Sequence, residues 1–196
     1  YIYIHTYIHI YRPVPRPPSS PSRRCRPPPP AKPSQKRKSA VAKTKKRSKK
    51  LCCVDKANVL ETSRLWRETV QSMEKNYPEI KVSYEFVDAV AMRLVQWPSS
   101  YDVLITSNLF GDILTDEASV ISGSMGLMPS ASIGSENALY EPIHGSYPEA
   151  TGKKIANPIA SILSLSMMLD HSFNLKDESK IINLSLIHIS EPTRRT

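Results

Sequence analysis

The first fifty residues of the chain have a composition that does not suit a folded core. They contain 15 of the 27 Lys and Arg residues, 10 of the 17 prolines and none of the 18 acidic residues. Such a segment buries too little apolar surface to offset the entropy lost on ordering. The rest of the chain holds 12 bases against all 18 acids, so the formal net charge of +9 belongs to one end only. We therefore expect packed structure only after about residue 51.

This N-terminal segment has three parts. Residues 1–11 alternate with a period of two, which is a strand pattern, but so uniformly that we interpret them as a translated simple repeat. Residues 12–33 are mostly Pro, Arg and Ser, and residues 34–50 are a self-repelling basic block. We predict a disordered, low-complexity tail over residues 1–53, foreign to the folded part. At the other end, residues 184–196 resemble translated sequencing adapter and are left out of the fold prediction.

Several classes of protein are excluded. No run of about 18 apolar residues is present, which excludes a membrane-spanning helix. No apolar segment with a small-residue cleavage site begins the chain, so we expect a cytoplasmic protein, or an organellar one in a eukaryote. Cys25, Cys52 and Cys53 are odd in number and suggest neither a disulfide framework nor a zinc site.

From residue 54 helical and strand patterns alternate, which predicts an α/β fold. We predict strands over 81–87 and 102–106, helices over 62–76, 89–95, 111–121 and 157–169, and a loop rich in Gly and Ser over 122–136. Asn157 is the expected cap of the last helix, with Pro158 in its first turn.

Asp112 and Asp116 are the first candidates for chemistry. Four residues apart in a helix, they lie on one face about one turn apart, and two carboxylates there repel each other. A divalent cation such as Mg²⁺ or Mn²⁺, which prefers oxygen ligands, would relieve that repulsion. Two acids that are simply solvated near a helix N-terminus, where the helix dipole favours them, are the alternative.

Six blocks in order then carry a family resemblance. They are residues 54–60, 86–92, 108–126, 129–132, 140–146 and 155–158. Together they resemble the isocitrate and isopropylmalate β-decarboxylating dehydrogenases over about residues 54–175. The resemblance implies a dehydrogenase of the isopropylmalate dehydrogenase-like two-domain α/β fold, with a partial domain over 54–183.

The resemblance also implies roles for four residues. Asp112 and Asp116 match the family's metal-binding pair, and Asp88 matches a third carboxylate that comes from the other subunit of a homodimer. Lys56 matches a lysine that reaches across the same interface and acts in acid/base chemistry. Without the surrounding blocks, Lys56 would be interpreted as an exposed lysine at a helix entry and Asp88 as a helix cap.

The expected cofactors are NAD and Mg²⁺ or Mn²⁺. The residues that match the family's adenosine-binding loop and helix start are His144, Gly145, Ser146, Glu149 and Asn157. An acidic side chain at the ribose accepts hydrogen bonds from its hydroxyls and repels a 2′-phosphate, which favours NAD over NADP. Glu149 occupies a position where Asp is common in the family. Alone, His144 would be interpreted as a loop residue.

The expected substrate is 3-isopropylmalate, in the oxidative decarboxylation of leucine synthesis. The wording of residues 129–132 and 140–146 favours it over isocitrate, homoisocitrate and tartrate, which family members also use. The family's first nucleotide-binding strands and substrate-clamping arginines have no match in residues 1–53. We therefore expect a truncated chain that is catalytically incompetent alone.

A nucleic-acid-binding protein is the alternative of another class. The Lys and Arg clusters of residues 12–50 would attract phosphate through counterion release. Against it, no aromatic residue follows Tyr11 in this segment to stack on bases, and the segment contains no folded reader module.

Overall fold

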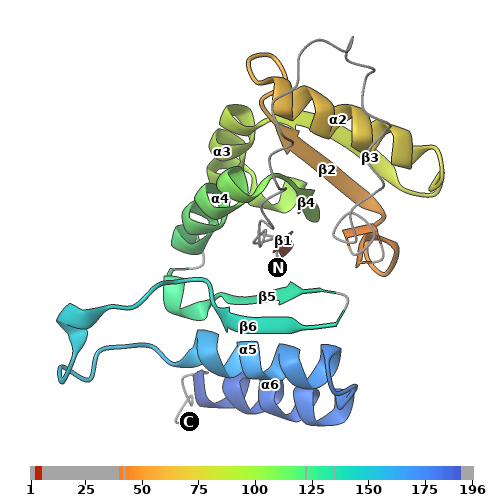
Figure 1. Cartoon of the computed structure of the whole chain (residues 1–196). Coiled ribbons are helices and arrows are strands. Elements are labelled where there is room, and N and C mark those ends of the chain that lie inside the picture. Colours follow the sequence, from red (N-terminus) through yellow and green to blue (C-terminus); the bar gives the residue numbers. More distant parts are fainter. Residues whose placement is uncertain (1–2, 6–39, 42, 122, 135, 191–196) are drawn as a thin grey trace, which may run out of the picture.

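A four-stranded parallel sheet forms the first half of the molecule. The structure, a computed structural model, describes residues 3–5, 40–41, 43–121, 123–134 and 136–190. The sheet comprises β1 (Tyr3–His5), β2 (Lys50–Asp55), β3 (Lys81–Phe86) and β4 (Val103–Ile105), in the order β1-β4-β2-β3. Parallel pairing requires crossover connections, and helices supply them (Figure 1).

Three helices connect and cover the strands: α2 (Glu61–Glu74), α3 (Val87–Gln96) and α4 (Asn108–Ile121). Strand β2 is buried on both faces, which explains its nearly continuous apolar sequence. On one face Leu51 and Cys53 pack with Val70 of α2. On the other, Cys52 and Val54 join a cluster with α3 and α4 that includes Val90, Leu94 and Leu114. These two clusters are the core, one on each side of β2.

Antiparallel pairing begins after α4. Strand β5 (Pro129–Ile133) pairs with β6 (Ala138–Pro142) in a hairpin. Helix α5 (Ile159–His171) packs against this hairpin, and α6 (Lys176–Ser190) packs against α5 (Figure 1). Short 3₁₀ turns occur at Pro98–Ser100 (η1), Met125–Leu127 (η2) and Pro148–Ala150 (η3).

The predicted helices and strands after residue 60 are confirmed within a few residues, but the loop over 122–136 is wrong for residues 129–133, which form β5. Pro129 begins β5, where a strand tolerates proline because the first position need not donate to the ladder. Ala131, in the middle of this strand, is buried. A Cβ on Gly134 would lie 2.8 Å from the carbonyl oxygen of Asn137, so the hairpin turn itself requires glycine. Gly134 thus belongs to the hairpin turn, whereas Gly123 and Gly126 precede β5.

The expectation that nothing packs before residue 51 is also wrong. Residues 40–41 and 43–45 are helical, and Ala40, Val41 and Thr44 are buried against the α2 side of the sheet. Their spacing gives one buried face, next to which Lys43 is half-buried, while Lys45 and Lys46 are exposed. Like-charge repulsion is offset because Lys45 pairs with Glu79, 2.7 Å away, and Arg47 pairs with Asp102. Strand β2 then begins at Lys50, inside the predicted tail.

The two terminal segments are described only in part. Tyr3–His5 forms β1, while residues 1–2, 6–39 and 191–196 lie outside the described residues. Residues 184–190, which we excluded from the fold prediction, form the last turns of α6. The simple-repeat and adapter origins of the two ends stay predictions. None of the helices in the described ranges is long and apolar enough to cross a membrane.

Candidate active site at the carboxyl edge of the sheet

The carboxyl ends of β2, β3 and β4 bring the predicted chemistry to one edge. In an open α/β sheet, ligands bind outside this edge. Lys56 follows β2 directly, and Asp88 lies in the first turn of α3, two residues after β3 ends. Helix α4, which carries Asp112 and Asp116, begins three residues after β4 ends. The parallel topology therefore gathers these segments from separate parts of the sequence.

Lys56 and Asp88 form an ion pair. Nζ of Lys56 lies 2.5 Å from Oδ1 of Asp88. The hydrogen bond from Lys56, together with backbone N–H groups in the first turn of α3, lowers the pKa of Asp88 below its usual range. The Asp88 side chain is 66% exposed, so solvent screens the pair. The ion pair therefore positions the Lys56 amine and adds little to stability.

Asp112 and Asp116 lie exposed on α4 and have no ion-pair partner within the described part of the chain. Partial burial and then the negative charge of Asp116 raise the pKa of Asp112. The amide Nδ2 of Asn108 donates a 2.9 Å hydrogen bond to Oδ2 of Asp112, which fixes the orientation of that carboxylate. The oriented carboxylate of Asp112 next to the unpaired negative charge of Asp116 suits a hard divalent cation, which prefers oxygen ligands.

The three predicted metal carboxylates do not converge within one chain. No group of three or more His, Cys, Asp or Glu side chains is close enough to hold a metal among the residues described. Asp88 pairs with Lys56, while Asp112 and Asp116 stand on α4. The described part of the chain therefore does not bring the three acids together.

Helices α3 and α4 pack side by side and expose apolar residues at helical spacing (Figure 1). On α4, Leu109, Ile113 and Val120 are 66%, 53% and 75% exposed, and the same three-to-four-residue spacing places Asp116 among them. On α3, Met92 and Val95 share a face with Asp88. Both groups of predicted ligands thus lie on apolar helix faces that the described residues leave exposed.

The predicted cofactor residues lie on the long connection between β6 and α5. This segment extends to one side of the hairpin and helices (Figure 1). Gly145, Ser146 and Glu149 are exposed, and Nδ1 of His144 lies 3.0 Å from the carbonyl oxygen of Gly145. A Cβ on Gly145 would meet no atom within 4 Å, so open space surrounds this part of the segment.

The predicted cap is wrong by one residue, because α5 begins at Ile159 with Pro158 in the N-cap position, next to Asn157. Oδ1 of Asn157 accepts a 3.0 Å hydrogen bond from the backbone N–H of Ile159. A Cβ on Gly126 would lie only 2.8 Å from the Cβ of Asn157, so η2 and the start of α5 touch at a position that requires glycine. This contact joins the end of the block 108–126 to the start of α5 at Asn157. An open loop next to a fixed helix start is an arrangement that suits a nucleotide.

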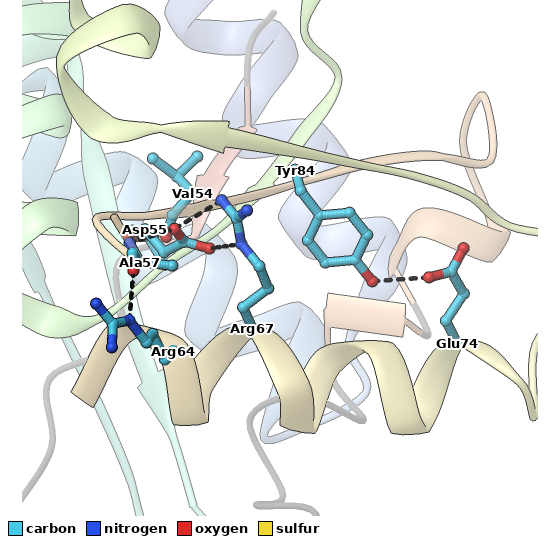
Figure 2. Close-up of polar contacts among 8 residues, drawn as sticks. Val54, Asp55, Ala57, Arg64, Arg67, Glu74 and Tyr84 are labelled. Atoms are coloured by element: carbon cyan, nitrogen blue, oxygen red, sulfur yellow. Dashed lines mark hydrogen bonds and ion pairs between the residues drawn. The ribbon is translucent and has the colours of Figure 1, made fainter. Parts of the chain in front are cut away.

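Sequence reasoning missed Asp55 and Arg67. Asp55, the last residue of β2, is 1% exposed and receives two hydrogen bonds from Arg67 of α2 (Figure 2). Asp55 lies in the block 54–60, and an acid next to Lys56 at a strand end indicates a partner for that turn. Arg67 had no signal of its own, because its pairing depends on how α2 lies over the sheet.

Comparison with known proteins identifies the family. The sequence profile described as isocitrate/isopropylmalate dehydrogenase matches residues 36–196. The chain belongs to the isocitrate/isopropylmalate dehydrogenase family. The matched range includes residues 36–53 of the predicted tail and residues 184–196.

Relatives in this family are similar over part of their length. A 3-isopropylmalate dehydrogenase from Oceanobacillus iheyensis is 58% identical over 137 residues, which is 69% of this chain and 37% of that protein. One from Wolinella succinogenes is 53% identical over 151 residues, covering 77% of this chain and 42% of that protein. The chain therefore spans about two fifths of the length of these relatives.

Solved structures of the family confirm the α/β, isopropylmalate dehydrogenase-like fold. The crystal structure of isocitrate dehydrogenase from Methylococcus capsulatus has a TM-score of 0.72 at 41% identity, over 74% of this chain and 43% of that one. A β-decarboxylating dehydrogenase from Thermococcus kodakarensis has a TM-score of 0.62 at 40% identity, over 69% and 41%. Members with different names thus share this fold.

Proposed function

We propose that this chain carries the metal-binding and proton-transferring part of an NAD-dependent dehydrogenase that oxidatively decarboxylates 3-isopropylmalate. The observation that carries the proposal is the carboxyl edge of the sheet, where Lys56 pairs with Asp88 and α4 presents two carboxylates that form no ion pair with the described residues. Relatives named 3-isopropylmalate dehydrogenase, at 52–58% identity, support this substrate over isocitrate, homoisocitrate or tartrate.

Asp112 and Asp116 would hold Mg²⁺ or Mn²⁺, with Asp88 of a second copy as the third carboxylate. Such an ion, when bound, polarises the substrate hydroxyl and stabilises the negative charge that develops as CO₂ leaves. Asn108 keeps Oδ2 of Asp112 oriented through its 2.9 Å hydrogen bond. Lys56 would exchange a proton with the substrate, a role that its part-buried amine at the strand end suits.

The segment from His144 to Asn157 would bind the adenosine half of NAD. Glu149, exposed in η3, is suited to accept hydrogen bonds from the ribose hydroxyls and to repel a 2′-phosphate. Asn157 is held by its hydrogen bond to the backbone of α5, and open space surrounds Gly145 in the loop. Both features favour a nucleotide that lies along the loop.

The partner would be a second copy of this chain, docked through α3 and α4. Large exposed apolar faces mark interaction surfaces, and here the apolar positions alternate with the acids that the site needs. Docking of two such faces would bring Asp88 and Lys56 of one copy toward Asp112 and Asp116 of the other. It would also cover Ile113 and Val95.

A chimeric enzyme tests the activity. Residues 49–174, from the turn before β2 to the turn after α5, would replace the matching segment of the Oceanobacillus iheyensis relative. We expect NAD reduction with 3-isopropylmalate that requires Mn²⁺, and a loss of roughly 10²- to 10⁴-fold with Lys56→Met. Equal turnover of isocitrate, homoisocitrate or tartrate would contradict the substrate, and full activity of Lys56→Met would contradict the site.

A sedimentation experiment on the chain itself tests the partner. Ile113→Lys places a charge in the apolar face of α4 and should shift the dimer to monomer. Val59→Lys changes a residue that is 64% exposed outside α3 and α4, and it should leave the dimer intact. A monomeric wild-type chain at micromolar concentration, or a dimer that survives Ile113→Lys, would contradict docking through this face.

A further inference from the structure

The turn that carries Lys56 is tied down on both sides of that residue. Oδ1 of Asp55 accepts a 2.9 Å hydrogen bond from the backbone N–H of Ala57. The residues before and after Lys56 therefore share one carboxylate, which is 1% exposed. On the other side of the turn, Nε of Arg64 donates a 2.9 Å hydrogen bond to the carbonyl oxygen of Ala57 (Figure 2). The backbone at Lys56 cannot rotate without breaking one of these bonds.

Arg67 fixes the carboxylate itself. Its Nε lies 2.7 Å from Oδ2 of Asp55 and its Nη2 lies 2.8 Å from Oδ1 (Figure 2). A guanidinium that donates to both oxygens sets the plane of the carboxylate as well as its position. The hydrogen bond to Asp55 raises the pKa of Arg67, so the charge that orients the carboxylate is kept.

Arg67 also reaches the strand that precedes Asp88. Its guanidinium carbon lies 5.1 Å from the ring centre of Phe86, and Nζ of Lys56 lies 5.8 Å from the same ring. Phe86 ends β3, two residues before Asp88. One arginine of α2 therefore contacts the supports of both members of the Lys56–Asp88 pair.

We infer that Arg67 is a positioning residue that, through Asp55 and Phe86, sets the Lys56 amine against the Asp88 carboxylate. The catalytic meaning of this placement rests on the proposed function, whereas the placement itself does not. A merely structural role would be to hold α2 on the sheet. The Tyr84–Glu74 hydrogen bond, 2.7 Å long, does that two turns along the same helix (Figure 2), so it offers a matched control.

Zero-length cross-linking of the full chain measures the placement. A carbodiimide activates a carboxylate, and a lysine amine in contact displaces the urea to form an amide. Mass spectrometry would quantify the Lys56–Asp88 link, with the Lys45–Glu79 pair, 2.7 Å apart, as the internal reference. Arg67→Met should lower the first yield about tenfold and leave the second unchanged, because a small displacement removes a contact geometry.

Two further variants keep the test decisive. Arg67→Lys keeps the positive charge but loses the two-point contact of the guanidinium with Asp55. Its Lys56–Asp88 yield should therefore lie between those of the wild type and Arg67→Met. This variant also tests the inference if Arg67→Met fails to fold. Tyr84→Phe should change neither yield. Equal loss of both links in the arginine variants, no loss in either, or the same loss in Tyr84→Phe would overturn the inference.

The chimeric dehydrogenase separates this inference from the proposed function. The cross-link needs no metal, cofactor or turnover, so an inactive chimera would contradict the function and leave the placement tested. In an active chimera, Arg67→Met should lower kcat roughly 10- to 100-fold while KM stays within about twofold. An unchanged kcat, or a rise in KM alone, would show that the placement has no role in the chemical step.

Discussion

Nζ of Lys56 lies 2.5 Å from Oδ1 of Asp88, across the carboxyl ends of two strands that pair in parallel. A second acid, Asp55, directly precedes Lys56 but is buried and accepts two hydrogen bonds from Arg67. Two neighbouring carboxylates of opposite exposure thus serve one lysine. The buried one fixes its backbone, and the exposed one receives its amine.

These two acids should respond differently to removal of charge. Asp55→Asn removes the buried carboxylate charge that pairs with the part-exposed Arg67 and should lower the free energy of unfolding by about 1.5–3 kcal/mol. Asp88→Asn should leave the urea midpoint at pH 7 unchanged, because solvent screens its ion pair. Circular dichroism during urea titration measures both. A large loss with Asp88→Asn would show that the Lys56 pair is structural.

The metal proposal predicts a thermal response that depends on two residues of α4. The raised pKa of Asp112 means that the folded state disfavours this charge, so the cost is present above that pKa and disappears as pH falls through it. Without metal at pH 7, Asp112→Asn should stabilise the chain by about 0.2–0.5 kcal/mol. Mn²⁺ at 100 times its Kd should stabilise the wild type by about 2.7 kcal/mol, and the variant should not respond.

Glu117→Gln provides the control for this measurement. Burial alone raises the pKa of Glu117, which follows Asp116 on the same helix. The variant therefore removes an acid of α4 that is not a predicted ligand. Its Mn²⁺ response should equal that of the wild type. A reduced response would indicate nonspecific attraction of the cation to an acidic helix.

Much of the fold was predictable from sequence because the helices after residue 60 carry strong periodic patterns. Residues 40–53 were not, since a basic run reads as disordered until Glu79 and Asp102 from distant parts of the chain are brought beside it. Strand β5 was missed because Pro129 and Gly134 resemble loop residues until β6 pairs with them. Local pattern fails where a long-range partner decides.

The candidate site divides in the same way. Six ordered motifs pointed to Lys56, Asp88, Asp112 and Asp116, and the structure brings the first two together. The Arg67–Asp55 support could not be predicted, because it depends on how α2 packs over β2. The predicted grouping of Asp88 with Asp112 and Asp116 is not found among the described residues.

The contact between η2 and α5 predicts a glycine requirement. Gly126→Ala would place a Cβ 2.8 Å from the Cβ of Asn157 and should destabilise the chain by about 1–3 kcal/mol. Gly145→Ala meets no atom within 4 Å and should stay within about 0.5 kcal/mol of the wild type. Differential scanning calorimetry of the two variants compares them. Equal stability would show that Asn157 can move freely.

The two buried cysteines should be chemically inert in the folded chain. Burial raises the pKa of both Cys52 and Cys53 to about 12, which leaves almost no thiolate at pH 8. In a Cys25→Ser background, a disulfide reagent should modify neither thiol at pH 8 and both after addition of guanidinium chloride. Rapid modification of the native chain would show that β2 opens readily.

The last prediction concerns the basic segment before β2, which Asp102 connects to the sheet. Burial raises the pKa of Asp102, but hydrogen bonds from Ser48 and Arg47 together lower it by more, so the net shift of the pKa is downward. This stabilisation is present above the ordinary Asp pKa and is lost as pH falls through the lowered one. Asp102→Asn should cost about 1.5–3 kcal/mol at pH 7, and the difference should shrink between about pH 5 and pH 1. Glu79→Gln removes only the exposed pair with Lys45 and should leave the urea midpoint unchanged at every pH. Equal effects of the two variants, or an Asp102→Asn deficit that does not depend on pH, would contradict the assignment of this segment to the fold through Asp102.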